Sequence, residues 1–352
     1  MFKQIYSIFI LLLTISCQAQ NQKPPQNVDQ PNSPQIDEYI VEMHEDKKGR
    51  LWFGTMGSGA ACFDGKKLSY LSENNGLAGN TVAAIVEDKE GNLWFGTHTG
   101  LSKYNGKTIV NFYEKDGLCN DRVANLLIDK SGVLWVGTWN GVCQFNGKNF
   151  SHFPIPKPEV ETLSYRETGE WVTEIIEDSQ GNIWFGRDGY GACKFDGKTF
   201  QHFTKKEGLV SNNVQAIQED REGKIWIGSR VGERDHPKPE ARKGGGGLNC
   251  FDGQKMIDFK EIKGLSQNDN YVIYLDKKGR VWISANSYGA YCFDGKSFQL
   301  YNKTDREDFN KKMFIQSILE DKNGKFWFGF SGGLFRLEGD KMINITQNGP
   351  WM

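Results

Sequence analysis

The sequence is poor in the residues that build metal sites. Its 352 residues include seven cysteines and five histidines, without a Cys-x-x-Cys pair or a His/Cys cluster at metal-ligand spacing. Positive and negative charges nearly balance, with 43 Lys plus Arg against 44 Asp plus Glu. A chain so close to neutral lacks the electrostatic attraction of a nucleic-acid-binding surface. We therefore expect no metal, no cofactor and no nucleic-acid partner.

Long apolar segments are also missing, except at the N-terminus. The basic start Met1-Phe2-Lys3 precedes the apolar run Ile8–Leu13, which is too short to span a bilayer as a stable helix. This order is typical of a signal peptide, which we assign to residues 1–16. Ile15-Ser16-Cys17 resembles the lipobox of bacterial lipoproteins, in which the cysteine is acylated. The alternative is a plain secreted chain with a free Cys17.

The segment behind Cys17 is polar and rich in proline and glutamine. It cannot bury enough apolar surface to fold, so we interpret residues 17–35 as the lipidated cysteine and a disordered tether. The folded domain is expected over residues 36–346, followed by a C-terminal tail at 347–352. The membrane is then a partner only through the lipid anchor.

A repeated phrase organises the remainder of the chain. Asp, Gly three residues later and Trp three beyond that, as in Asp88-Lys-Glu-Gly91-Asn-Leu-Trp94, occur seven times. Periods of roughly 40 to 50 residues are typical of propeller blades. The repeated tryptophans are Trp52, Trp94, Trp135, Trp184, Trp226, Trp282 and Trp327.

Each repeat predicts four short strands. In the second copy we expect them at 82–87, 93–96, 101–104 and 107–113, separated by turn residues such as Asn105-Gly106. Apolar residues on both faces fit sheets that are covered by a neighbour on each side. The predicted fold is therefore all-β, a seven-bladed β-propeller of four-stranded antiparallel blades.

The repeat residues are expected to be structural. The tryptophans should be buried between blades, with the indole N–H satisfied by a backbone carbonyl. The aspartates should hold turns and not form a metal ring, because seven blades keep them on a wide circle. Ring closure is expected from packing of the last blade against the first, since all seven units are complete within Tyr39–Thr346.

The blade cysteines recur by position. Cys143 and Cys193 hold one repeat position, and Cys250 and Cys292 hold another. Export permits disulfides, but equivalent positions in neighbouring blades lie farther apart than the roughly 4.4 to 6.8 Å between Cα atoms that a disulfide requires. We therefore expect small core residues at these positions.

The phrase Asp-x-x-Gly-Asn-Leu-Trp-Phe-Gly-Thr, followed by Gly-Leu-x-x-Tyr-Asn-Gly-Lys, resembles the two-component regulator propeller repeat. The resemblance covers about residues 39–346. That repeat builds the periplasmic sensor region of many bacterial hybrid histidine kinases. No kinase, receiver, immunoglobulin-like or membrane segment is recognisable here, so the resemblance implies a stand-alone propeller lipoprotein without kinase activity.

Two insertions break the regularity, Pro154–Trp171 between the third and fourth blades and Arg230–Gly247 within the fifth. Both are expected opposite the Asp-x-x-Gly turns, with the loops between second and third strands and the crossings between blades. Binding residues concentrate on variable loops over a rigid scaffold. The alternative is that a charged, Gly-rich insertion is merely tolerated.

Residues on this face form the candidate ligand-binding set. Positions four past each repeat tryptophan, and positions just before each innermost strand, differ from blade to blade. Aromatic and charged side chains there would stack on and hydrogen-bond a sugar or a similar polar ligand, although each taken singly also fits an ordinary surface residue. The candidates are His98, Arg122, Trp139, Trp171, Arg187, Asp188, Tyr190, Arg230, Asn286 and Tyr288.

Three functions fit such a face. We expect non-catalytic binding of a small ligand such as a carbohydrate, or of an envelope protein, in envelope sensing or two-component signalling. The second is a lyase or hydrolase similar in fold to the streptogramin B lyases, for which only His98 and His236 lie on the face as a histidine base. The third is a scaffold for envelope protein assembly. All three place the protein at the cell envelope, facing the periplasm or the cell surface.

Overall fold

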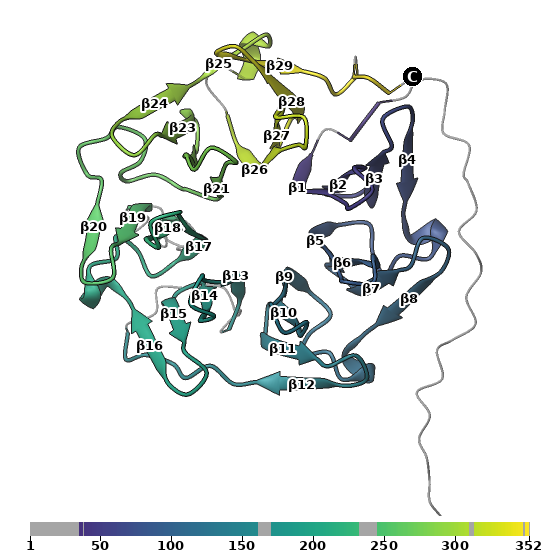
Figure 1. The fold of residues 1–352 in the computed structure, drawn as a ribbon, viewed down its shortest axis with the longest axis horizontal. Coiled ribbons are helices and arrows are strands. Elements are labelled where there is room, and N and C mark those ends of the chain that lie inside the picture. The colour runs from purple at the N-terminus through teal and green to yellow at the C-terminus, as the bar shows by residue number, and fades with distance from the viewer. Residues whose placement is uncertain are drawn as a thin grey trace, which may run out of the picture.

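The computed structural model describes residues 35–37, 39–160, 170–231, 245–309, 313–347 and 349–351. The predicted signal peptide, Cys17 and nearly all of the tether therefore lie outside the described residues. Seven antiparallel sheets follow one another around a central axis (Figure 1). The predicted seven-bladed propeller of four-stranded blades is confirmed.

Each blade is a meander in which the chain moves outward from the axis. The innermost strands are β1 (Ile40–Glu45), β5 (Val82–Glu87), β9 (Val123–Ile128), β13 (Val172–Glu177), β17 (Val214–Glu219), β21 (Ile273–Leu275) and β26 (Ile315–Glu320). The second strands are β2 (Leu51–Thr55), β6 (Leu93–Thr97), β10 (Leu134–Thr138), β14 (Ile183–Arg187), β18 (Ile225–Ser229), β22 (Val281–Ala285) and β27 (Phe326–Phe330).

The outer half of each blade has two further strands. The third strands are β3 (Ala60–Phe63), β7 (Gly100–Tyr104), β11 (Gly141–Phe145), β15 (Gly191–Phe195), β19 (Gly247–Phe251), β23 (Gly289–Phe293) and β28 (Gly333–Glu338). The outermost strands are β4 (Leu68–Leu71), β8 (Ile109–Phe112), β12 (Phe150–Phe153), β16 (Phe200–Phe203), β20 (Met256–Asp258), β24 (Phe298–Tyr301) and β29 (Lys341–Asn344). The seventh blade gains a fifth strand, β25 (Lys303–Thr304), parallel to β29.

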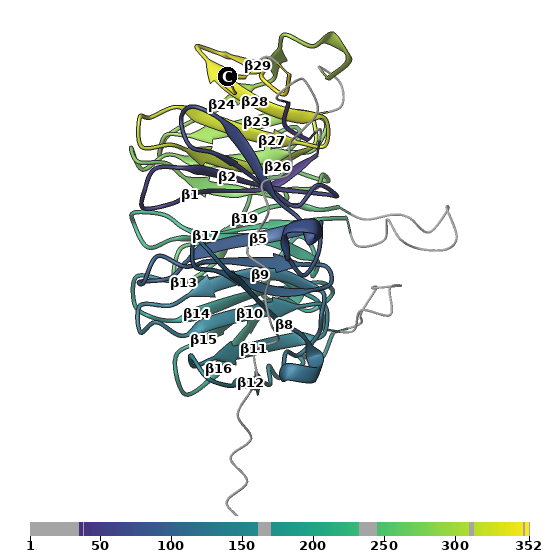
Figure 2. The ribbon, with the colours of Figure 1, turned by 90° about the vertical axis from the view of Figure 1, so that its right-hand side faces the viewer.

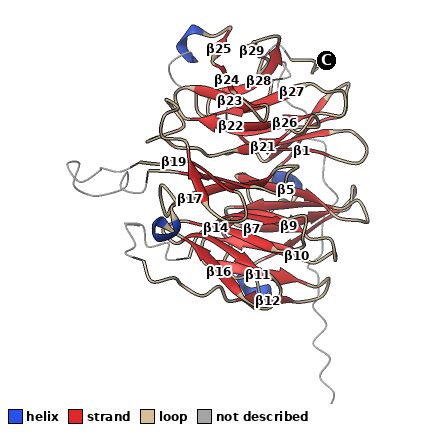
Figure 3. Cartoon of the chain, turned by 60° about the vertical axis from the view of Figure 1, so that its left-hand side comes forward, coloured by secondary structure: helices blue, strands red, loops and turns tan. Residues whose placement is uncertain are grey.

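In the described part of the chain, helical structure is limited to short 3₁₀ turns near the rim of the ring (Figure 3). They are η1 (Glu73–Asn75), η2 (Glu114–Asp116), η3 (Lys205–Glu207) and η6 (Glu307–Phe309). The first three lie in crossings between blades, and each ends at a glycine with positive φ. Within the described ranges, no helix is long and apolar enough to cross a membrane.

The repeated aspartate and tryptophan of each blade form a bonded pair. In all seven blades the indole N–H donates to the carboxylate of the turn aspartate, at 2.8–3.1 Å. In the second blade, Asp88 Oδ1 also accepts from the backbone N–H of Asn92 across the turn. The aspartates are thus turn residues, as predicted, but the expected backbone carbonyl partner of the indole is wrong. The carboxylate reaches the indole because it lies six residues before it, at the end of the same hairpin.

These hydrogen bonds act on the turn carboxylates. Although burial alone raises the pKa of Asp178, hydrogen bonds from Asn182 and Trp184 outweigh it, and the pKa lies below the usual value. The same balance lowers the pKa of Asp46, which accepts from Trp52 and Arg50. Asp46 and Asp178 therefore stay ionised and hydrogen-bonded at neutral pH.

Seven hydrophobic clusters fill the seven interfaces between blades. Every repeat tryptophan is at most 4% exposed and packs against the following blade, as predicted. Trp327 of the last blade packs in one cluster with Ile40 and Phe53 of the first. The ring therefore closes by blade-on-blade packing, and Figure 1 shows β26 beside β1.

Trp351 extends this core beyond the predicted boundary at residue 346. Its ring is 2% exposed and lies edge-on to Phe53 and Phe63, with centroids 6.2 and 5.1 Å away. Its indole N–H donates to the carbonyl of Ile345. Trp351 therefore belongs to the closing interface, because its ring packs in one cluster with residues of the first and last blades.

In six of the seven blades a glycine before the end of the second strand allows the blades to approach closely near the axis. A Cβ on Gly54 would lie 2.5 Å from the carbonyl oxygen of Val82 in the next blade. A Cβ on Gly329 would lie 2.8 Å from that of Ile40, across the closing interface. In the sixth blade Ser284 stands at this position, and its hydroxyl accepts from the backbone of Tyr271 and Val272, beside the shortened strand β21.

Candidate functional site

The two faces of the ring differ, as the edge-on view in Figure 2 helps to follow. We call the face with the Asp-x-x-Gly turns the turn face. The opposite face, with the loops between second and third strands and the crossings between blades, is the mouth face. Both predicted insertions interrupt loops of the mouth face, between β12 and β13 and between β18 and β19.

On the turn face one contact links successive blades. A glutamate at the end of an innermost strand accepts from the backbone N–H that follows the turn aspartate of the preceding blade, at 2.6–2.7 Å. The closing interface uses the same contact, from Lys322 N–H to Glu45 Oε2. Ile128 and Leu275 replace the glutamate in two blades, where Lys89 and Arg221 side chains instead reach the backbone of the following blade.

On the mouth face one backbone hydrogen bond recurs in every blade. The residue four past the repeat tryptophan donates its N–H to the carbonyl of the residue before the innermost strand, or of its equivalent in the sixth blade. This bond places two side chains of each blade next to each other at the mouth. The resulting mouth pairs are Tyr39/Met56, Thr81/His98, Arg122/Trp139, Trp171/Asp188, Asn213/Arg230, Asp269/Asn286 and Phe314/Ser331.

The mouth pairs of the second to fourth blades form an aromatic cluster. Trp139 and Trp171 stack on each other, with centroids 5.0 Å apart and planes at 29°. The Arg122 guanidinium lies 4.3 Å from the Trp139 ring centroid, and His98 meets Trp139 edge-on at 6.3 Å. The structure therefore brings these four candidates together. It also covers part of the indole surface that the sequence offered to a ligand, because Trp139 and Trp171 stack on each other and Arg122 packs on Trp139.

Within this cluster His98 is kept neutral. Burial first, and the positive charge of Arg122 second, lower the pKa of His98 below its usual value. A neutral imidazole can accept a proton or a hydrogen bond. No carboxylate among the described residues is hydrogen-bonded to its ring to orient it as a base.

Asp188 and Arg230 form a buried ion pair between the fourth and fifth blades. Arg230 Nε donates to Asp188 Oδ1 at 3.0 Å and Nη2 donates to Oδ2 at 2.8 Å. Asp188 is 0% and Arg230 5% exposed. This bidentate geometry is the strongest arrangement for such a pair. Both candidates are therefore structural partners of each other at the mouth, which sequence alone did not predict.

The polar contacts continue into the sixth blade. Asp269 Oδ1 accepts from the backbone N–H of Val231, and Oδ2 accepts from the hydroxyl of Tyr271 at 3.1 Å. Asn286 Nδ2 lies 3.5 Å from the same carboxylate. Asp269 and Asn286 are both buried. Contacts between neighbouring mouth residues thus run from the second blade to the sixth.

At the mouth of the fourth to sixth blades, five buried polar atoms have no hydrogen-bond partner among the described residues. They are Trp171 Nε1, Arg187 Nε, Asn213 Oδ1, Asn270 Oδ1 and Asn286 Oδ1. All belong to the mouth pairs or to a residue directly before or after one of them in the chain. Because buried polar groups nearly always find a partner in protein, water or ligand, this part of the mouth has hydrogen-bonding capacity left for a bound molecule.

Two tyrosine candidates lie beside the mouth pairs. Tyr190 stacks under the Arg187 guanidinium, whose Cζ lies 4.6 Å from the ring centroid. Tyr288 packs beside Gly264 and Lys263 of the crossing between the fifth and sixth blades. No described contact joins Tyr288 to the other candidates. The insertion residues at 161–169 and 232–244, His236 among them, lie outside the described residues.

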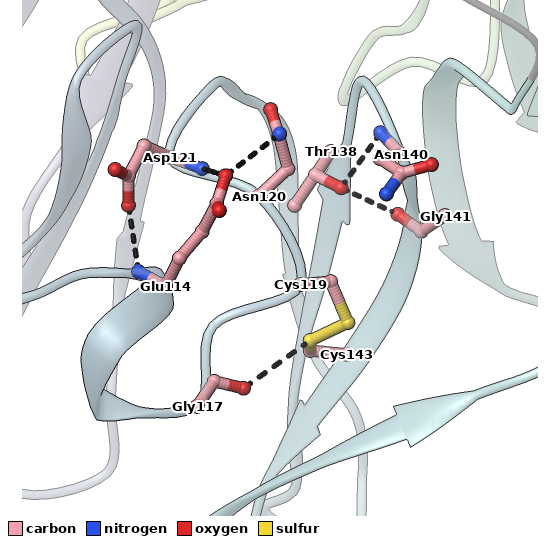
Figure 4. The surroundings of a disulfide bond; sticks show 9 residues. All are labelled: Glu114, Gly117, Cys119, Asn120, Asp121, Thr138, Asn140, Gly141 and Cys143. Atoms are coloured by element: carbon pink, nitrogen blue, oxygen red, sulfur yellow. Dashed lines mark hydrogen bonds between the residues drawn. A yellow bond between two sulfur atoms is a disulfide. The ribbon is translucent and has the colours of Figure 1, made fainter.

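A disulfide supports the aromatic cluster, and here the sequence prediction was wrong. Cys143 is bonded to Cys119, with Cα atoms 5.8 Å apart (Figure 4). Cys119 lies in the crossing that leads into the third blade, so the bond joins two segments of one blade and not equivalent positions of two. Comparing only repeat positions missed it. Cys62, Cys193, Cys250 and Cys292 are free and buried, as expected of core residues.

The disulfide lies close to Arg122 in sequence. The crossing from Gly117 to Asp121 is further fixed by Glu114, which accepts from Asn120 Nδ2 and from the backbone of Asp121. Asn120 Oδ1 in turn accepts from the backbone N–H of Arg122. The segment that carries Arg122 is therefore fixed by the disulfide and by the hydrogen bonds of Glu114 and Asn120. No group of three or more His, Cys, Asp or Glu side chains in the described ranges could hold a metal ion.

Comparison with protein families confirms the resemblance. The model of the family "Two component regulator propeller" matches residues 34–57, 76–99, 117–140, 208–230 and 311–332. This chain carries two-component regulator propeller repeats. The matched repeats lie in blades 1, 2, 3, 5 and 7, and each runs from a crossing to the mouth residues behind the tryptophan. No curated protein matches the chain.

Solved structures share the propeller fold. The extracellular domain of BT3049 from B. thetaiotaomicron, named as a hybrid two component system, is 22% identical with a TM-score of 0.55, over 85% of this chain and 45% of that one. Virginiamycin B lyase from Staphylococcus aureus is 14% identical with a TM-score of 0.62, over 88% and 97%. PorZ, a surface component of the type-IX secretion system of Porphyromonas gingivalis, is 16% identical with a TM-score of 0.61, over 92% and 48%.

These likenesses differ in how much of the other protein they cover. The chain spans less than half of the length of BT3049 and of PorZ, but nearly the whole lyase. At identities this low the shared feature is the fold.

Proposed function

We propose that this protein is an exported, lipid-anchored and non-catalytic recognition module, which binds a polar ligand or an envelope protein through its mouth face. The observation that carries the proposal is the contrast at the mouth of blades 4 to 6. There, five buried polar atoms of mouth residues have no hydrogen-bond partner in the part of the chain that the structure describes. A uniform scaffold with one variable, unsatisfied face is the usual arrangement of a binding module.

Carbohydrate is the favoured ligand class. The stacked Trp139/Trp171 pair would offer the indole surface that its own stacking and Arg122 leave uncovered. The buried donors and acceptors at the mouth that have no partner among the described residues could hydrogen-bond the hydroxyl groups of a sugar, which both donate and accept. The family repeat and the extracellular domain of BT3049 support an exported sensor, with signalling to a separate kinase as its extension. Cys17 supplies the membrane attachment in this proposal.

The test is a thermal-shift screen of the purified protein against oligosaccharides and small envelope metabolites. We expect a saturable rise of Tm with at least one oligosaccharide, and loss of that response in Trp139→Ala/Trp171→Ala. Lys66→Ala, an exposed change on the turn face, is the matched control. A response that survives in the double variant would contradict binding at the mouth. No response across the library would favour the protein partner, including a scaffold for envelope protein assembly.

A lyase or hydrolase is the second candidate, favoured by the fold shared with virginiamycin B lyase over nearly its full length. His98, with a lowered pKa, would be the base. If the first proposal holds, His98→Ala leaves ligand binding nearly intact and the ligand is recovered unchanged. Turnover of the ligand by the protein, abolished in His98→Ala, would establish the enzyme instead.

A further inference from the structure

Arg187 departs from the repeat at a position that is structural elsewhere. The second strand ends in a threonine or serine in four other blades, and that hydroxyl donates to a glycine carbonyl at the loop into the third strand. In the fourth blade this place is held by Arg187, which has no such hydroxyl. In the fourth blade a long, positively charged side chain therefore stands where other blades have a short hydroxyl side chain that is hydrogen-bonded within the hairpin.

The Arg187 guanidinium is buried without a bonded counter-ion. The residue is 1% exposed, and its Nη1 donates to the carbonyl of Pro156 at 2.9 Å. Its Nε is buried and has no partner. Glu170 acts on it electrostatically, but that carboxylate is bound by Lys157 Nζ at 2.8 Å. Among the described residues, no carboxylate is hydrogen-bonded to Arg187.

Arg230 of the next blade shows what a paired arginine looks like in the same surroundings. It is buried to a similar extent, but both carboxylate oxygens of Asp188 accept its hydrogen bonds. A buried charge without a partner costs several kcal/mol, and proteins normally pair it. Burial lowers the pKa of Arg187, in keeping with an incompletely compensated cation. The position is therefore built to receive a negative group.

We propose that Arg187 binds a carboxylate of the mouth ligand, so that the ligand class is an acidic, uronate-containing oligosaccharide. The inference rests on the proposed function, which it deepens. A planar carboxylate matches the edge of a guanidinium and receives two parallel hydrogen bonds. Trp171 Nε1, a second unpaired donor of the same blade, serves the neighbouring sugar oxygens.

Tyr190 and the Lys157–Glu170 ion pair lie beside Arg187. Lys157 Nζ lies 5.7 Å from the centroid of the Tyr190 ring. The Arg187 guanidinium packs on the same ring. The side chains of Lys157 and Glu170 are 50% and 33% exposed. Because an exposed ion pair contributes little free energy, Lys157 exchanges Glu170 for the incoming carboxylate at small cost.

The experiment measures binding of trigalacturonate and of the neutral galactotriose by titration calorimetry with the purified protein. We expect trigalacturonate to bind more tightly, and Arg187→Thr to weaken it by about 10- to 100-fold, the value of a hydrogen bond to a charged group. Arg187→Thr introduces the threonine that stands at this position in the first three blades, so its Tm equals or exceeds that of the wild type. Arg221→Thr removes the same charge from the turn face and leaves the affinity unchanged.

Several outcomes would overturn the inference. One is equal affinity of the wild type and Arg187→Thr for trigalacturonate. Another is tighter binding of galactotriose than of trigalacturonate. In that second case, loss of galactotriose binding in Trp139→Ala/Trp171→Ala would still support the proposed function. If neither sugar binds, the rise in Tm caused by acetate at constant ionic strength must be larger for the wild type than for Arg187→Thr. Failure of acetate, or equal stabilisation by sulfate, rejects a carboxylate site.

Discussion

On the turn face the same contacts recur around the ring, whereas on the mouth face each blade presents a different pair of side chains. Trp94, for example, is bonded to Asp88 as Trp327 is to Asp321. At the mouth, Trp139 has His98 on one side and Trp171 on the other, with no repetition. The backbone bond that presents the mouth pairs is nevertheless the same in all blades. The backbone is therefore the same in every blade as far as the hydrogen bond between the two residues of a mouth pair, and only the side chains of those residues vary.

This contrast separates the energetic roles of the two faces. Repeated contacts between blades hold the ring closed, so their loss should cost stability in any blade. Residues of the mouth pairs should matter for binding and less for stability, with the buried Asp188–Arg230 pair as the exception. The following changes test that division, from the largest expected effect to the smallest.

Trp135→Ala should lower the free energy of unfolding by about 3 to 5 kcal/mol, because it removes a buried indole from the interface between the third and fourth blades. Chemical denaturation measures the change. Trp139→Ala, four residues away on the mouth face and only partly buried, is the matched control and should cost about 1 kcal/mol. Equal losses in the two variants would remove the distinction between core and mouth tryptophans.

Asp188→Ala should cost about 3 kcal/mol, because Arg230 is then left buried without its counter-ion. The double variant Asp188→Leu/Arg230→Met should recover most of the loss, since an apolar pair of similar volume removes both charges. A double variant as unstable as the single one would show that the pair organises the mouth in another way. Urea denaturation of the three proteins decides.

Reduction of Cys119–Cys143 should cost about 2 to 4 kcal/mol. Cys119→Ser/Cys143→Ser should reproduce the effect and make the protein insensitive to reductant. The accompanying loss of order near Arg122 would be visible as faster amide exchange in residues 117–122. Unchanged exchange there would mean that Glu114 and Asn120 hold the segment without the disulfide.

A further test, outside that order, varies the pH and concerns two carboxyl groups on innermost strands, Glu42 and Glu174. Burial, and then the charge of Glu174, raise the pKa of Glu42 to about 8, and burial raises the pKa of Glu174 to about 8 despite a hydrogen bond from Asn125. The folded protein thus binds these protons more tightly than the unfolded chain. Its stability should fall as the pH rises from about 4.5 to about 8. Tm measured across that range should change less in Glu42→Gln/Glu174→Gln, and an unaltered profile would exclude these groups as the cause.

The sequence was sufficient for the parts of the fold that repeat. Seven Asp-x-x-Gly-x-x-Trp phrases predicted the blades, the buried tryptophans and the turns, because the same local chemistry recurs at a fixed spacing. The sequence analysis did not predict contacts between residues that hold different positions of the repeat. Cys119 lies in a crossing without a fixed repeat spacing, and the Trp52–Asp46 bond joins a side chain to a side chain across a hairpin.

The candidate site was predicted by place more than by contact. The backbone bonds confirm that Arg122, Trp171 and the positions behind each tryptophan meet at the mouth. Their pairing could not be foreseen, because Asp188 and Arg230 belong to different blades, 42 residues apart. The importance of Arg187 emerged only when its burial and missing partner could be seen. Ligand binding by these residues stays a prediction.

The most direct test of the central claim blocks one face at a time. Met56→Cys on the mouth face and Lys66→Cys on the turn face, both exposed positions, would be prepared with Cys17→Ser and coupled to a bulky maleimide, since the described free thiols are buried. Retention of trigalacturonate, of other screened ligands and of envelope proteins would then be compared. The account predicts that the adduct at position 56 abolishes binding and that the adduct at position 66 does not. Binding lost only with the turn-face adduct would contradict it.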